Sequence, residues 1–125
     1  MRGQFLRDVA RTVTKPIVRI DLLDLDVTFR GARSPRLGVG VASGDYRPFR
    51  AAQQAFQAAG GYPDHPAAYT LIVVAFAPGS MRNGEGKMAA REIFQHVNTD
   101  TFLNIGLIED EKLPAGTIRV SVLLG

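Results

Sequence analysis

The segment from residue 36 to residue 59 constrains the fold of this chain more than any other stretch. In its first part, apolar residues alternate with glycines, which predicts a short β-strand over 36–42. Small residues follow, and a helical pattern begins at once over 46–59, with Ser43 or Asp45 as the expected N-cap. A strand, a tight turn and a helix in this order indicate an α/β unit.

The other apolar patterns extend this unit to a larger fold. Helices that follow strands in this way favour right-handed crossovers, which place both helices on the same face of the sheet. The sequence predicts an α/β fold, an α+β two-layer sandwich with a four-stranded mixed sheet in the order β-α-β-α-β-β. In the last strand, polar and apolar residues alternate, so one face of the sheet is expected to be partly wet. The further elements are a helix at 3–14, a strand at 69–77, a helix at 85–97, and strands at 101–108 and 116–124.

Residues 16–35 are predicted to form a long loop. Pro16 ends the first helix because proline cannot donate a backbone hydrogen bond and disfavours helix in the residue before it. The acidic segment IDLLDL at 20–25 lies within this loop. Loops of such length in a compact domain are usually functional or disordered.

The composition narrows the class of protein. A chain of 125 residues suits one domain, and 46% apolar residues with 22% charged residues are typical of a globular protein. The absence of cysteine excludes disulfides and thiolate chemistry, and is compatible with a cytoplasmic location. The longest apolar run, at 71–77, is too short to span a bilayer, so no membrane segment is expected.

No cofactor or metal site is expected within the chain itself. The glycine-rich stretch GSMRNGEGK at 79–87 lies between a strand and a helix, but Glu85 stands where a phosphate-binding loop has lysine. An ordinary connection is the favoured interpretation, with a weak anion site at Arg82 and Lys87 as the alternative. The two histidines, at 65 and 96, have no second ligand at metal-binding spacing.

Three segments together resemble the C-terminal domain of the FtsZ/tubulin family of filament-forming GTPases. They are IDLLDL, the strand-to-helix segment GVASGDYRPFRAAQQAF, and the closing TFLNIGLIEDEKLPAGTIRVSVLLG. The resemblance implies cytoskeletal polymerisation in cell division. It also implies that 1–125 is a single domain of this type, with 1–15 as the end of the central helix, 16–35 as the synergy-type loop region, and 36–125 as the sheet and two helices.

The resemblance further implies a shared active site. Asp21 and Asp24 fall where the family's loop carboxylates act in trans on GTP bound to the next subunit, and a carboxylate can orient water and accept its proton. Arg19 replaces the usual asparagine, and Leu22 and Leu23 replace the usual Phe-Ala, so we expect weakened or absent hydrolysis. The expected partner is the chain itself or an FtsZ-like nucleotide-binding domain, and GTP hydrolysis is expected only when such a domain completes the site.

Three alternatives remain open at this stage. The acids of the loop, including Asp26, can be solvated and paired with Arg19 or Arg30. Residues 1–36 hold eight basic and four acidic residues, which suggests a nucleic-acid-binding module of split β-α-β type, although nucleic acid is the less favoured partner. The last alternative is a small oligomeric ligand-binding or lyase-type domain with Arg47 or Arg119 lining a cleft.

Overall fold

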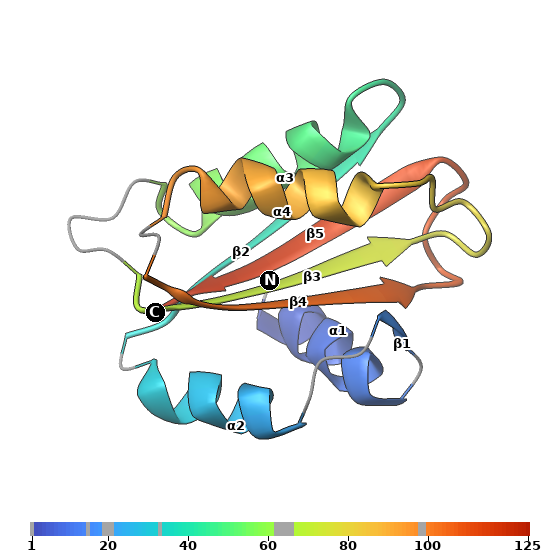
Figure 1. Cartoon of the computed structure of the whole chain (residues 1–125). Helices are drawn as coiled ribbons and strands as arrows, with labels where there is room; N and C mark the ends of the chain where they lie inside the picture. The colour runs from blue at the N-terminus through green and yellow to red at the C-terminus, as the bar shows by residue number, and fades with distance from the viewer. Residues whose placement is uncertain (1, 15, 19–21, 33, 62–66, 98–99) are drawn as a thin grey trace.

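The computed structural model describes the chain except at residues 1, 15, 19–21, 33, 62–66 and 98–99 (Figure 1). The predicted strands and helices outside the loop region are confirmed with their bounds within one residue, except that the helix predicted at 85–97 ends at Phe94. The elements are α1 (Arg2–Thr14), β1 (Pro16–Val18), α2 (Leu22–Gly31), β2 (Arg36–Ser43), α3 (Arg47–Ala58), β3 (Tyr69–Phe76), α4 (Glu85–Phe94), β4 (Phe102–Glu109) and β5 (Thr117–Leu124).

The strands form one mixed sheet in the order β1-β4-β3-β5-β2. Strand β3 is central, parallel to β4 and antiparallel to β5. Helices α3 and α4 cover one face of the sheet, while α1 and α2 lie against the other (Figure 1). The side chains from Leu71 to Phe76 are therefore fully buried, as the continuous apolar run of β3 predicts. Among the helices of the described part, none has both the length and the apolar character that crossing a bilayer demands.

Glycines in β2 allow α3 to lie directly on the strand. A Cβ atom added to Gly38 would overlap the carbonyl oxygen of Ala55, and one added to Gly40 would overlap that of Ala51. The interpretation of these glycines as a close-packing device is confirmed. The expected N-cap is wrong: Tyr46 caps α3 in a left-handed conformation with φ 59°, without a side-chain hydrogen bond to the helix.

The prediction that 16–35 is one long loop is wrong. The segment holds β1, which adds a fifth strand by antiparallel pairing with β4, and the helix α2. Leu25 and Thr28 on α2 are buried against the sheet. Leu25 of the acidic segment therefore belongs to the core, because a surface helix needs only a narrow inward stripe, and Asp26 on another side of the helix is exposed.

The prediction of a partly wet face on the last strand is also wrong. All eight residues of β5 are buried, because α1 and α2 cover the second face of the sheet. Polar residues on that face are paired instead of solvated: Arg119 and Ser121 both donate hydrogen bonds to Asp8 of α1.

Candidate functional site

The first turn of α2 carries Asp24, one of the two predicted site residues. Asn104 of β4 fixes this turn, since its Nδ2 donates to the Asp24 backbone oxygen at 3.4 Å and to Thr28 Oγ1 at 3.0 Å. The Asp24 side chain is half-buried, and no described residue donates a hydrogen bond to its carboxylate. A carboxylate is well placed at a helix N-terminus, where backbone N–H groups face it. Asp21 and Arg19 lie outside the described residues.

Asp26, two residues further on, behaves differently. Its carboxylate lies 2.9 Å from Arg30 Nε in an exposed i,i+4 ion pair. Such pairs contribute roughly 0.3–0.5 kcal/mol. The interpretation as a solvated acid paired with Arg30 is therefore confirmed for Asp26. The carboxylate of Asp24 has no such partner among the residues that the structure describes.

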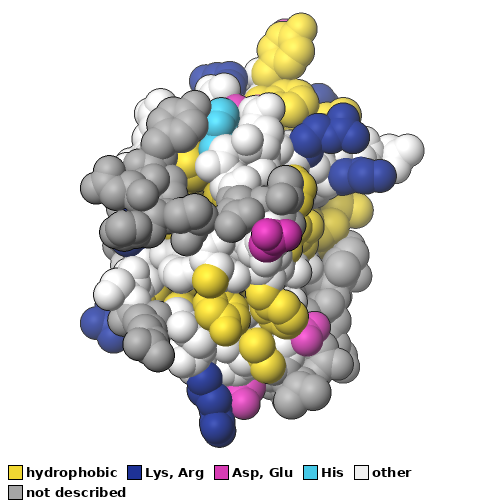
Figure 2. Space-filling model, turned by 60° about the vertical axis from the view of Figure 1, so that its left-hand side comes forward, with side chains coloured by type: hydrophobic (Ala, Val, Ile, Leu, Met, Phe, Trp, Pro, Cys, Tyr) yellow, Lys and Arg dark blue, Asp and Glu magenta, His cyan; other side chains and the backbone are white. Residues whose placement is uncertain are grey.

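An exposed apolar surface extends from the middle of α2 to its C-terminal end. Phe102 is 38% exposed and its ring centroid lies 6.2 Å from that of Tyr69. Gly31 of α2 lies so close to the Tyr69 ring that a Cβ atom would overlap it, and Val27, one turn earlier, is 40% exposed. We name Val27, Tyr69 and Phe102 the α2 patch. Figure 2 shows hydrophobic side chains gathered on this side of the molecule. These partly exposed apolar side chains form a candidate contact surface.

In the glycine-rich connection before α4, acidic side chains accept hydrogen bonds from backbone N–H groups. Glu109 accepts a hydrogen bond from the Gly79 N–H at 2.8 Å, and Glu85 accepts one from the Arg82 N–H at 2.7 Å. These are backbone donors that a bound phosphate would need. The connection therefore favours the interpretation as an ordinary turn.

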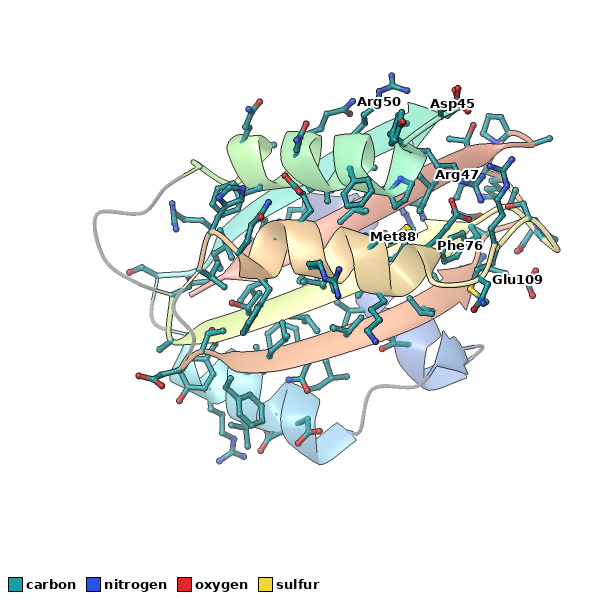
Figure 3. All side chains as sticks on the ribbon, turned by 45° about the horizontal axis from the view of Figure 1, so that its top comes forward. Asp45, Arg47, Arg50, Phe76, Met88 and Glu109 are labelled. Atoms are coloured by element: carbon teal, nitrogen blue, oxygen red, sulfur yellow. The ribbon has the colours of Figure 1, made fainter. Side chains whose placement is uncertain are left out.

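Arg47 is buried in an ion pair and does not line a cleft as a free cation. Its guanidinium donates to both carboxylate oxygens of Glu85 at 2.6 Å and to the Ser80 carbonyl at 2.7 Å, and it lies 5.9 Å from the centroid of the Phe76 ring (Figure 3). Burial alone would raise the pKa of Glu85, but the Arg47 guanidinium and the Arg82 N–H outweigh it, so this pKa lies below its usual value.

Arg119 is likewise neutralised. It donates to Asp8 through Nε at 3.1 Å and Nη2 at 2.6 Å, and to Asp110 at 2.9 Å. Asp110 also accepts the Lys112 N–H. A cavity of about 400 Å³ adjoins this cluster, with Arg119, Asp8 and Asp110 in its wall. Arg119 therefore lines a cavity, as predicted for a ligand-binding domain, but the carboxylates of Asp8 and Asp110 already hold its guanidinium.

Acid is expected to weaken the Asp110 contact. Burial alone would raise the pKa of Asp110, but the Lys112 N–H and the Arg119 guanidinium outweigh burial, so the folded pKa lies below its usual value. A group with a depressed folded pKa stabilises the fold above its unfolded pKa and loses this contribution as the pH falls through the folded value. Between about pH 5 and pH 3, the unfolding midpoint of the wild type should therefore fall more steeply than that of Asp110→Asn, measured by urea titration. Parallel pH profiles for the two proteins would contradict this assignment.

The nucleic-acid alternative requires an open sheet face on which bases stack. Helices cover both faces of the sheet in the described part of the chain (Figure 1). The aromatic residues exposed there are Phe29 on α2, Tyr46 before α3 and Phe102 at the start of β4, none of them on an open sheet face. The structure therefore does not support that alternative.

Sequence reasoning missed a groove between α3 and α4. It has a volume of about 460 Å³ and is lined partly by Phe56, Glu92 and His96. The rings of Phe56 and His96 stack with centroids 5.2 Å apart, and Glu92 accepts hydrogen bonds from Gln53 and Gln95. In the sequence, the i,i+4 spacing of Glu92 and His96 is the signal that these two side chains lie on the same face of α4 and its C-terminal turn.

The structure is an α/β domain in which two helix pairs enclose a mixed sheet, and the half-buried Asp24 lies in the first turn of α2. No protein family model matches the sequence. The structure is similar to a mutant FtsZ from M. jannaschii, with a TM-score of 0.84 and 18% identity over 95% of this chain and 36% of that chain. It is also similar to CetZ from Methanosaeta thermophila strain DSM 6194, with a TM-score of 0.60 and 18% identity over 96% of this chain and 34% of that one.

A third similar structure is a GTPγS-bound protofilament of CetZ2 from Haloferax volcanii. Its TM-score is 0.59 and its identity is 22%, over 85% of this chain and 33% of that chain. The chain spans about a third of the length of these structures. It has the fold of an FtsZ/tubulin-like C-terminal domain.

Proposed function

We propose that this chain is the polymerisation domain of an FtsZ-like cytoskeletal GTPase and supplies carboxylates in trans to GTP on a neighbouring subunit. The observation that supports it is the Asp24 carboxylate, which stands without a described hydrogen-bond donor on a turn fixed by Asn104. A carboxylate held in this way can orient an attacking water and accept its proton.

The chain is proposed to lack a nucleotide-binding site of its own. Glu109 and Glu85 occupy backbone N–H groups in the glycine-rich connection, and Glu85 also neutralises Arg47. Hydrolysis then requires two subunits, because one holds the phosphates and the other positions the water. The similar CetZ2 structure is a GTPγS-bound protofilament, which fits a contact between successive subunits.

The α2 patch is proposed as the apolar part of that contact. Val27 follows Asp24 by three residues on α2, and Tyr69 contacts Gly31 at the C-terminal end of the same helix, so a neighbour that covers the length of α2 would contact both the patch and Asp24. The neighbour is a second copy of the protein or an FtsZ-like nucleotide-binding domain. Burial of the patch would exclude bulk water from the surroundings of Asp24 and strengthen the interaction of its carboxylate with the attacking water.

The Asp24→Ala substitution tests this function. Residues 1–125 are joined to the GTP-binding domain of an FtsZ, and GTP turnover is measured during assembly. We expect Asp24→Ala to lower turnover by about a hundredfold, since a general base contributes at least that factor. The isolated chain is expected to show no saturable GTP binding by calorimetry.

Asp26→Ala is the matched control, because it removes an acid from the same helix and breaks only the exposed pair with Arg30. Its turnover should stay within about twofold of the parent. Equal losses for Asp24→Ala and Asp26→Ala, or no loss for Asp24→Ala, would refute the proposal. A parent fusion with the full rate of a native FtsZ would refute the weakened hydrolysis expected from Arg19.

A further inference from the structure

Strand β2 is the outer strand of the sheet, and its free edge is only half shielded. Within the described chain, it pairs with β5 alone. On its other edge, the Val41 N–H donates to Gln54 Oε1 at 3.0 Å, and the Ser43 carbonyl accepts a hydrogen bond from Arg50 at 2.7 Å. Two side chains of α3 therefore close the C-terminal half of this edge.

The N-terminal half has no such shield. In an antiparallel ladder, the backbone groups of alternate residues point to opposite edges. Because Val41 and Ser43 point away from β5, Leu37 and Val39 do so as well. No hydrogen bond joins the N–H or C=O of Leu37 or Val39 to any other described residue on this edge. Natural sheets usually guard such an edge with charged residues, proline or a bulge, and 37–43 contains no charge or proline and keeps an unbroken register.

We propose that the edge of β2 binds β2 of a second copy in antiparallel orientation, about a two-fold axis at Gly38. In this register, Leu37 of each copy lies opposite Val39 of the other. Each free N–H of one copy then meets a free C=O of its partner, so all four backbone groups are satisfied together. The proposal does not depend on the proposed GTPase function.

The neighbouring positions fit this register. Val41 would lie opposite Pro35, which has no N–H to offer, and the Val41 N–H already bonds Gln54. The two copies of Gly38 would face each other in a non-hydrogen-bonded pair, where Cα atoms approach most closely. The added strand therefore leaves the contact between Val41 and Gln54 in place.

Helix α3 leaves room for a second copy at the axis. A Cβ atom on Gly38 would meet the backbone of Ala55 and Ala59, so the C-terminal half of α3 lies over Gly38. Gln54 lies over Gly40, and the exposed Ala58, one turn further along, lies toward the axis. Small side chains allow two helices to approach closely, so the α3 helices of both copies can lie side by side.

Sedimentation velocity and amide hydrogen exchange over a range of protein concentrations test the proposal on the chain as it is. We expect a weak reversible dimer, the class that small interfaces form. The amides of Leu37 and Val39 should gain protection as the dimer forms, while the amide of Val41, which Gln54 already holds, should change little. A chain that stays monomeric at millimolar concentration overturns the proposal, and so does a dimer without protection at Leu37 and Val39.

Ala58→Lys and Gln57→Lys form a matched pair of variants. Both add one positive charge to an exposed position of α3, but Gln57 lines the groove toward α4, whereas Ala58 follows by one turn Gln54, whose side chain bonds the β2 edge. Like charges at the two-fold axis should raise the dimer dissociation constant at least about tenfold in Ala58→Lys, with Gln57→Lys close to the wild type. Equal effects of the two variants would overturn the placement. The Val39→Pro substitution removes an N–H that points to the free edge and makes no hydrogen bond to β5, so it should abolish the dimer and leave the pairing of β2 with β5 in place.

Discussion

Replacement of Asp8 by alanine is expected to lower the free energy of unfolding by about 3–5 kcal/mol. Asp8 is fully buried, and its carboxylate accepts hydrogen bonds from Arg119, from Ser121 at 2.7 Å and from Gln4 at 2.9 Å. Its loss leaves Arg119 buried with one carboxylate, Asp110, in place of two. The melting temperature should fall by roughly 10–20 °C for a chain of this size.

Urea unfolding of Asp8→Ala, Arg119→Ala and the double variant measures the coupling directly. Because each single variant leaves a buried charge or donor without its main partner, the double variant should lose less than the sum of the two. Asp26→Ala is the surface control and should change stability by less than about 0.5 kcal/mol. A loss below about 1 kcal/mol in Asp8→Ala would contradict the buried network.

Strong periodicity made most elements predictable from the sequence. The apolar run of β3 can only be satisfied inside a sheet with both faces covered, and Leu71 to Phe76 are indeed fully buried. The alternating glycines of β2 were also interpretable from the sequence, since the missing side chains at Gly38 and Gly40 allow α3 to pack directly on the strand. In these cases, local pattern and tertiary packing agree.

The elements that were missed depend on contacts with distant parts of the chain. Strand β1 is three residues long and exists by pairing with Ile108 and Leu107 of β4, so no local signal marks it. Few residues of helix α2 face the core, so its apolar periodicity is weak. Its acidic residues therefore suggested a solvated loop. The polar face of β5 looked wet because nothing near Arg119 in the sequence shows that Asp8 of α1 comes to meet it.

The candidate site was only partly predictable for the same reason. The resemblance named Asp24, but the hydrogen bonds from Asn104 that fix its turn come from a strand far away in the sequence. The contrast between Asp24 and Asp26 also needed the structure, because both are loop acids in the sequence and only Asp26 has its cation one helical turn away. Asp21 stays a prediction, since it lies outside the described residues.

Replacement of Glu85 by alanine is expected to have a second large effect, a loss of about 3–5 kcal/mol in the free energy of unfolding. Arg47 is 1% exposed and relies on Glu85 for its charge partner, with further contacts to the Ser80 carbonyl and the Phe76 ring. The same carboxylate accepts the Arg82 N–H before α4. One substitution therefore leaves a buried cation and a backbone donor unpaired together.

Glu109→Ala is the matched control for this prediction. Glu109 is exposed and bonds the Gly79 N–H in the same connection, so its loss should cost at most about 1 kcal/mol in urea unfolding. Glu85→Gln keeps hydrogen-bonding atoms but removes the charge, and should fall between Glu85→Ala and the wild type. A buried guanidinium that has lost its carboxylate lowers the free energy of unfolding by more than the loss of one exposed hydrogen bond. If Glu85→Ala unfolds at the same urea concentration as Glu109→Ala, the ion pair with Arg47 therefore does not hold α3 and α4 together.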